Sequence, residues 1–256
     1  MKQQILRTGL LVLLFFGATA LVVPEEKITV WLVGDSTVCD QPLDRAPVTG
    51  WGTPFAAFFD STVVVKNHAK GGRSTRTFIS EGRWETVKKE MKAGDYVLIQ
   101  FGHNDEAKEP QYKDRYTPVP DYKKNLALMI TDTRANQAIP VLVTPVSRMR
   151  FNDQGTALET HTEYTAAVWK VGKQYKVPVI DLDAHSRKLL QQLGPEPSQM
   201  LFMYLDSMQH PHYPNGRKDG THFNEYGARR MAELVLAEMR KQQLPLVARI
   251  TTKAAP

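Results

Sequence analysis

Two short segments contain residue types that could carry out nucleophilic chemistry. Ser36 lies in the turn-forming segment Gly34-Asp35-Ser36-Thr37, and Asp219 and His222 lie three residues apart with Gly220 between them. A carboxylate bound to one imidazole nitrogen fixes the tautomer, so the other nitrogen can accept a serine proton. Taken alone, each segment is also typical of a helix-capping serine or a surface Asp-His pair.

Two further segments could supply donors to a developing oxyanion. Gly71-Gly72 allows a backbone N–H to approach a ligand closely, and Asn104 follows Gly102-His103 with an amide that can donate. An ordinary turn glycine and a turn asparagine remain the alternatives for these positions.

The elements that must position these residues are short apolar runs separated by helical patterns. Most runs are continuously apolar, which is typical of parallel strands buried on both faces. The expected strands are Ile28–Val33, Thr62–Lys66, Tyr96–Phe101, Pro140–Thr144 and Val177–Leu182. The expected helices are Arg83–Met91, Asp121–Asn136, Glu163–Tyr175 and Glu225–Arg240, the last capped by Asn224.

Alternating strands and helices predict a doubly wound α/β sheet, in which ligands bind beyond the carboxyl ends of the strands. Three of the four segments directly follow an expected strand, and the fourth directly precedes the last helix. Because these ends are expected to converge, the sequence predicts one site with a nucleophile, a base, an orienting acid and two oxyanion donors.

The N-terminus has the pattern of a secretory signal peptide. Lys2 and Arg7 precede a charge-free apolar stretch that ends in small residues, Gly17-Ala18-Thr19-Ala20. A retained membrane anchor is the alternative, but the stretch is short for a membrane span. We expect a signal peptide over residues 1–23, one catalytic domain over 24–250 and a flexible tail over 251–256. Export would place the mature protein outside the cell or in the periplasm, free of the membrane.

Composition limits the partners. The net charge is +6, and it falls to +4 without Lys2 and Arg7. This mild excess suits an acidic polysaccharide or a solubilising surface, and no basic run indicates nucleic acid. The single cysteine, Cys39, excludes an intramolecular disulfide. His210 and His212 lack the spacing of a metal motif, so no metal or cofactor is expected. We expect a monomer.

The four segments together resemble the SGNH (GDSL-type) hydrolase superfamily. The blocks here are Gly34-Asp35-Ser36, Gly72, Gly102-His103-Asn104-Asp105 and Asp219-Gly220-Thr221-His222. The resemblance implies a flavodoxin-like three-layer α/β/α sandwich with a five-stranded parallel sheet. It also implies Ser36 as nucleophile, His222 as base, Asp219 as its partner, and an oxyanion hole from Ser36, Gly72 and Asn104.

A narrower resemblance is to rhamnogalacturonan acetylesterases. It rests on Gly50-Trp51-Gly52, Gly71–Ser74, Glu81–Trp84 and the run from Gly94 to Asp105, and it continues in Val143–Val146 with Arg148 and Phe151. Met149 departs from the polar or basic residue expected there. The resemblance implies hydrolysis of acetyl esters on the pectic rhamnogalacturonan backbone. Its galacturonate carboxylates suit arginine, and the expected substrate contacts are Arg73, His103, Arg148 and His210.

Three alternatives remain open. The same fold could serve a lipase, lysophospholipase or thioesterase, although the segments 41–50 and 108–120 are polar and form no apolar trough for an acyl chain. The substrate could instead be acetylated xylan or an oligosaccharide. An inactive carbohydrate-binding module on a hydrolase scaffold is the third alternative, because fold alone does not fix function.

Overall fold

The computed structural model describes residues 27–251 and contains a five-stranded parallel sheet. Its strands are β1 (Ile28–Gly34), β2 (Val63–Asn67), β3 (Tyr96–Gln100), β4 (Ile139–Val143) and β5 (Val179–Ile180). Their order is β2-β1-β3-β4-β5, and every neighbouring pair is parallel. This is the flavodoxin-like order, whose switch point lies between β1 and β3. The predicted fold class is confirmed.

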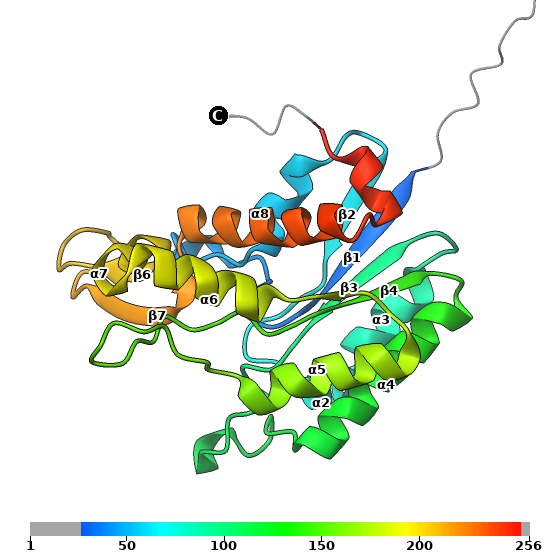
Figure 1. Cartoon of the computed structure of the whole chain (residues 1–256), viewed down its shortest axis with the longest axis horizontal. Helices are drawn as coiled ribbons and strands as arrows, with labels where there is room; N and C mark the ends of the chain where they lie inside the picture. Colours follow the sequence, from blue (N-terminus) through cyan, green and yellow to red (C-terminus); the bar gives the residue numbers. More distant parts are fainter. Residues whose placement is uncertain (1–26, 252–256) are drawn as a thin grey trace, which may run out of the picture.

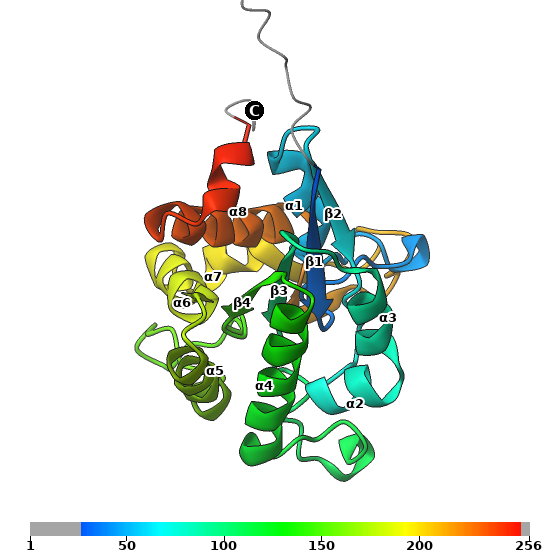
Figure 2. The same cartoon turned by 90° about the vertical axis from the view of Figure 1, so that its right-hand side faces the viewer.

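Helices cover both faces of the sheet (Figure 1; Figure 2). Val30 and Leu32 of β1 point into a core with helices α1, α6 and α8, whereas Trp31 and Val33 point into a second core with α3, α4 and α5. The α-helices of the described chain are α1 (Gly52–Phe55), α2 (Thr75–Ser80), α3 (Arg83–Glu90), α4 (Val119–Ala135), α5 (Thr162–Tyr175), α6 (Leu182–Leu193), α7 (Pro195–Ser198) and α8 (Glu225–Lys241). The two apolar faces of β1 explain why its sequence lacks alternation.

Helix ends follow local capping chemistry. The side chain of Asn224 accepts from the backbone N–H of Gly227, which confirms the predicted cap of α8. The fifth strand is shorter than expected, because Asp181 caps α6 by accepting from Ala184 and the chain is already helical at Leu182. Short 3₁₀ helices cover Leu43–Arg45, Ala56–Phe58, Pro110–Tyr112, Gln199–Leu201 and Pro245–Arg249.

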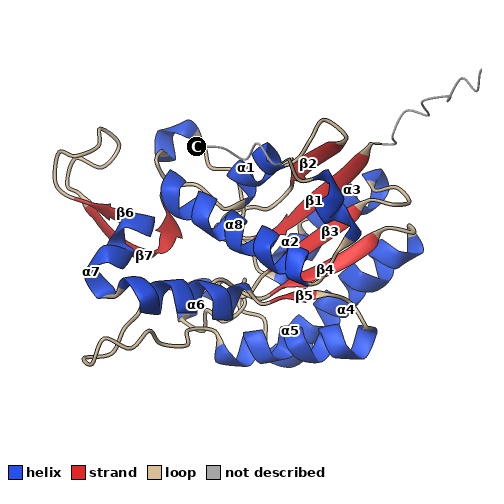
Figure 3. Ribbon diagram, turned by 45° about the horizontal axis from the view of Figure 1, so that its top comes forward, coloured by secondary structure: helices blue, strands red, loops and turns tan. Residues whose placement is uncertain are grey.

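A two-stranded antiparallel hairpin lies beyond the sheet, and the sequence analysis did not predict it (Figure 3). It consists of β6 (Phe202–Leu205) and β7 (Arg217–Phe223). Phe202 pairs with Phe223, but the next residue of β6, Met203, pairs with Asp219. The three residues 220–222 therefore bulge out of the ladder, and a bulge of this kind redirects side chains.

The structure does not describe the first 26 and the last five residues. The expected signal peptide, residues 1–23, lies outside the described residues, as do residues 252–256 of the expected tail. The backbone N–H of Thr251, the first residue of the expected tail, donates to the carbonyl of Phe58 at 2.9 Å. This residue is therefore bonded to the domain. Between residues 27 and 251, no helix has the length and apolarity needed to cross a membrane.

Candidate active site

The structure brings together the three residues expected to form a catalytic triad. The Oγ of Ser36 lies 3.0 Å from Nε2 of His222, and Nδ1 of His222 lies 2.8 Å from Oδ2 of Asp219. An ionised Asp219 requires the proton to be on Nδ1, which leaves Nε2 free to accept the serine proton. The arrangement can therefore activate the Ser36 hydroxyl as a nucleophile.

Ser36 lies in a tight turn immediately after β1. The carbonyl of Asp35 accepts from the backbone N–H groups of Val38 and Cys39, at 3.2 and 3.1 Å. This turn does not continue into an α-helix. Only one turn forms, and the next α-helix, α1, begins at Gly52. The serine hydroxyl is thus presented at the edge of the sheet by a single turn.

Asp219 is held by donors on both carboxylate oxygens. Its Oδ1 accepts from the backbone N–H groups of Thr221 and His222, at 2.8 and 3.1 Å, and its Oδ2 accepts from Arg217 as well as His222. Burial acts to raise the pKa of Asp219, but the bonds from His222 and Arg217 outweigh it and hold this pKa far below its usual range. The carboxylate is therefore ionised whenever His222 must act as a base.

Two of the three predicted oxyanion donors, Gly72 and Asn104, lie in the loops that follow β2 and β3. A Cβ added to Gly71 would lie 3.6 Å from the Cβ of Ser36, so the loop after β2 passes beside Ser36. Gly72 has φ +79°, a left-handed conformation that favours glycine. Asn104 is buried, and it donates one amide hydrogen to the carbonyl of Arg73 at 3.0 Å. This bond fixes the amide plane and leaves a second N–H available.

His103 is buried next to the turn that carries Ser36. Its Nδ1 lies 3.5 Å from Oδ2 of Asp35, and its ring centroid lies 4.2 Å from that of His161. Burial, with a further contribution from His161, lowers the pKa of His103 to about 4, so the ring is neutral at pH 7. Burial raises the pKa of the nearby Asp105 to about 7, although Thr75 donates to its Oδ1.

The other residues expected to contact substrate differ in how they are engaged. Arg73 forms two bonds to the Glu81 carboxylate and one to the carbonyl of Gly71. Within the described chain, the ring contacts of His210 are with His212 and Tyr213 in the β6–β7 loop. A role in substrate binding stays a prediction for both Arg73 and His210.

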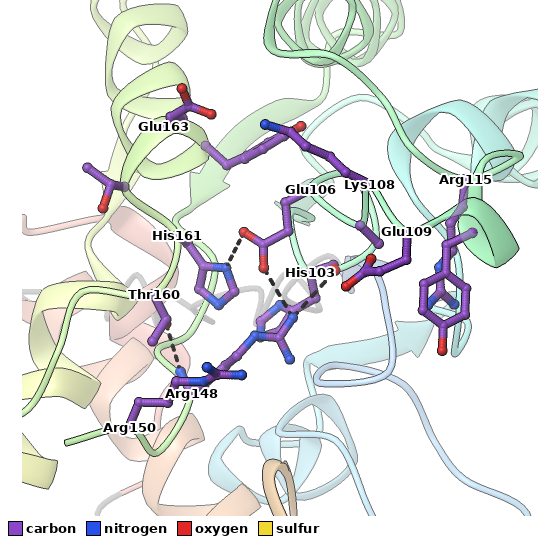
Figure 4. A pocket seen from close by; sticks show the side chains of 14 residues that line it. His103, Glu106, Lys108, Glu109, Arg115, Arg148, Arg150, Thr160, His161 and Glu163 are labelled. Atoms are coloured by element: carbon purple, nitrogen blue, oxygen red, sulfur yellow. Dashed lines mark hydrogen bonds and ion pairs between the residues drawn. The ribbon is translucent and has the colours of Figure 1, made fainter. Parts of the chain in front are cut away.

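A polar pocket of about 570 Å³ opens at the ends of β3 and β4 (Figure 4). His103 and Arg148 belong to its wall, whereas Ser36 and His222 do not. The full lining is His103, Glu106, Ala107, Lys108, Glu109, Tyr112, Arg115, Arg148, Arg150, Thr160, His161, Thr162, Glu163 and Tyr164. Arg148 connects the pocket wall to the loop that carries Asp219 and His222, because it donates to Oγ1 of Thr221 at 2.8 Å.

Sequence reasoning missed two residues of this pocket, Glu106 and His161. Nδ1 of the buried His161 lies 2.9 Å from Oε2 of Glu106, and Oε1 of Glu106 accepts from Arg148 at 3.1 Å. Glu106 directly follows the Gly102–Asp105 block, so its position could have indicated a role. His161 is at the N-cap of α5 and carries no recognisable motif.

Metal and thiol chemistry find little support in the described residues. Between residues 27 and 251, no three His, Cys, Asp or Glu side chains are grouped so that they could hold a metal ion. Burial raises the pKa of the Cys39 thiol to about 11, so it stays protonated and is a poor nucleophile.

Comparisons with known proteins identify the family of this chain. Residues 32–230 match the model of the GDSL-like Lipase/Acylhydrolase family. The chain is 43% identical to the rhamnogalacturonan acetylesterase RhgT of Bacillus subtilis, covering 87% of this chain and 94% of that protein. It is 28% identical to a rhamnogalacturonan acetylesterase of Emericella nidulans, over 81% of this chain and 83% of the relative.

Solved structures show the same fold. The crystal structure of Bacillus subtilis YxiM matches with a TM-score of 0.73 and 30% identity, over 87% of this chain and 58% of that one. A catalytic mutant of Axe2, an acetylxylan esterase from Geobacillus stearothermophilus, matches with a TM-score of 0.63 and 16% identity, over 87% and 97% of the two chains. The chain therefore belongs to the GDSL-like lipase/acylhydrolase family and is a carboxylic ester hydrolase.

Proposed function

We propose that this protein removes acetyl groups from a plant cell-wall polysaccharide, with rhamnogalacturonan as the substrate, through an acyl-enzyme on Ser36. The hydrogen-bonded chain from Ser36 through His222 to Asp219 carries the mechanistic part of the proposal. The 43% identity to RhgT over nearly the whole chain supports the substrate, because that relative is a rhamnogalacturonan acetylesterase.

In the first half-reaction, Ser36 Oγ attacks the acetyl carbonyl carbon while its proton passes to Nε2 of His222. The negative charge on the carbonyl oxygen is stabilised by the backbone N–H groups of Ser36 and Gly72 and by the Asn104 amide. The intermediate then collapses, the bond to the sugar oxygen breaks, and His222 returns the proton to that oxygen. Acetyl-Ser36 and a free sugar hydroxyl result.

In the second half-reaction, water takes the place of the sugar. His222 accepts a proton from water while the water oxygen attacks the carbonyl carbon of acetyl-Ser36. The same donors stabilise the new oxyanion. Collapse breaks the bond to Ser36 Oγ, which recovers its proton from His222, and acetate leaves. Asp219 remains ionised throughout and stabilises the imidazolium form of His222.

The chemistry of the pocket favours a glycan over an acyl chain. Most of its lining side chains carry hydrogen-bonding or charged groups, among them Glu106, Arg148 and Thr160. Glycan hydroxyls can exchange hydrogen bonds with such groups, whereas a long acyl chain needs an apolar trough. The alternative function is that of a lipase or thioesterase. Faster hydrolysis of p-nitrophenyl octanoate than of p-nitrophenyl acetate would support this alternative.

The proposal extends to location and assembly. We place the mature enzyme outside the cytoplasm, after removal of residues 1–23, where a polysaccharide can be reached. All the proposed catalytic groups come from one chain, so a monomer suffices for the reaction. The mass of the exported protein would test the cleavage.

The decisive experiment measures acetate release from acetylated rhamnogalacturonan beside acetylated xylan, with Ser36→Ala as the control. We expect fast release from the pectic polymer, and a loss of about 10⁶-fold in the variant because the nucleophile is gone. Release from xylan alone would contradict the substrate. Full activity of Ser36→Ala would contradict the mechanism.

A further inference from the structure

The segment that carries the base lacks the support that the parallel sheet gives the nucleophile. Residues 220–222 bulge from the β6–β7 ladder, so no strand partner fixes Thr221 and His222. The backbone contact to a neighbouring loop is a bond from Met149 N–H to the carbonyl of Gly220, at 2.8 Å. A Cβ on Gly220 would lie 3.0 Å from the Met149 carbonyl oxygen, so a larger residue here would press on the loop that carries Met149.

Arg148, the residue before Met149, supplies a second contact to the same bulge. Its Nη1 donates to Oγ1 of Thr221 at 2.8 Å, and the backbone N–H of Thr221 donates to Oδ1 of Asp219 at 2.8 Å. The guanidinium is therefore separated from the catalytic carboxylate by one residue. The arginine side chain is only 22% exposed, and it bridges the loop after β4 to the hairpin.

The guanidinium of Arg148 is itself fixed on its other side. Nη2 donates to Oε1 of Glu106 at 3.1 Å and lies 3.5 Å from the carbonyl oxygen of His103 (Figure 4). The other oxygen of Glu106 is 2.9 Å from Nδ1 of His161, a side chain with no exposed surface. One carboxylate thus joins the buried His161, at the N-cap of α5, to Arg148 near the start of the same β4–α5 connection.

We propose that Arg148 is a positioning residue that fixes the bulge bearing His222, and that Glu106 and His161 hold its guanidinium in place. The role differs from the substrate contact predicted for Arg148 from the sequence, because both ends of its guanidinium are already bonded within the protein. Arginine suits this role because its planar fork can serve two acceptors at once. The inference rests on the proposed roles of Ser36, His222 and Asp219.

The test is a double-mutant cycle on the full chain, assayed with p-nitrophenyl acetate. Arg148→Met should lower kcat about 10- to 100-fold with KM nearly unchanged, because a misplacement of about 1 Å can cost 100-fold. Thr221→Val removes the acceptor and should lower kcat in the same direction. If both act through one contact, the double variant should be no slower than Arg148→Met alone. Arg148→Lys should recover part of the loss, since an ammonium can serve one of the two acceptors.

Arg187→Met is the matched control, because Arg187 is also partly buried and pairs with Glu159 and Asp183 without contacting the bulge. It should lower thermal stability while leaving kcat of the folded enzyme unchanged. A raised KM with normal kcat in Arg148→Met, losses that multiply in the double variant, or an equal loss of kcat in Arg187→Met would each overturn the inference.

Ser36→Ala separates this inference from the proposed function. If Ser36→Ala remains active, the proposed mechanism fails regardless of Arg148. If Ser36→Ala is inactive and Arg148→Met is as fast as wild type, only the positioning role fails.

Discussion

Asp219 is surrounded only by donors, and this makes Asp219→Asn a sharp perturbation. His222 Nδ1 and Arg217 face Oδ2, while two backbone N–H groups face Oδ1. Asparagine has one acceptor oxygen and one donor NH₂ group. Whichever way the amide is turned, its NH₂ group must face a pair of donors.

The more damaging orientation places the amide NH₂ against His222 Nδ1. The ring would then accept at Nδ1 and carry its proton on Nε2, which could no longer take the proton of Ser36. We expect kcat to fall about 10⁴-fold, the size of effect that a wrong tautomer produces in a serine triad. That loss corresponds to about 5 kcal/mol of transition-state stabilisation. The opposite orientation would leave two N–H groups of the bulge unpaired, at a cost of about 1–3 kcal/mol each in folding stability.

The assay is initial-rate hydrolysis of p-nitrophenyl acetate, with thermal unfolding measured on the same samples. KM should change little, because the acid acts through the base rather than on the substrate. Asp206→Asn, an exposed position in the same hairpin loop, is the control and should behave as wild type. A kcat for Asp219→Asn within tenfold of wild type would show that this carboxylate does not set the tautomer of His222.

Two further predictions concern buried groups whose effects on stability oppose each other. His103 has a pKa of about 4 in the folded chain and about 6.5 when unfolded. It therefore contributes up to about 3 kcal/mol to the free energy of unfolding above pH 6.5, and this contribution is lost as the pH falls towards 4. Asp105 has a pKa of about 7 in the folded chain and 3.8 when unfolded, so its contribution is present below pH 4 and is lost as the pH rises to 7. The test is urea unfolding between pH 4 and 8. In His103→Asn only the Asp105 effect remains, so the free energy of unfolding should fall as the pH rises; in Asp105→Asn only the His103 effect remains, so it should rise. The same pH dependence of the unfolding free energy in both variants would contradict both assignments.

The sheet and the position of Ser36 at its edge were predictable because their signals are local. The apolar run of β1 meets Gly34, and the next polar residues must lie at the carboxyl edge of a parallel sheet. Ser36 and Asn104 follow neighbouring strands, β1 and β3, on either side of the switch point. Their convergence follows from strand order alone, without knowledge of any side-chain contact.

The hairpin was not predictable in the same way. The sequence of β7, Arg217–Phe223, contains three charged residues and a glycine, which is unlike a typical strand. Its strand residues pair with β6, and its bulge contacts the loop after β4, some seventy residues earlier. Contacts so distant in sequence leave no periodic pattern.

The number of arginines near the site is a poor guide to the charge of the substrate. From the sequence, a mild excess of positive charge and the arginines Arg73 and Arg148 were expected to suit an acidic substrate. In the structure, however, Arg73 pairs with Glu81, Arg148 with Glu106 and Arg217 with Asp219. A paired arginine presents little net field to a substrate, so its charge serves to order a loop rather than to attract an anion. The proposed preference for an acidic polysaccharide would then rest on cations without such partners, such as Arg150, for which the described residues form no ion pair. Neutralising Arg150 should weaken binding of a polyuronide more than neutralising a paired arginine of equal exposure.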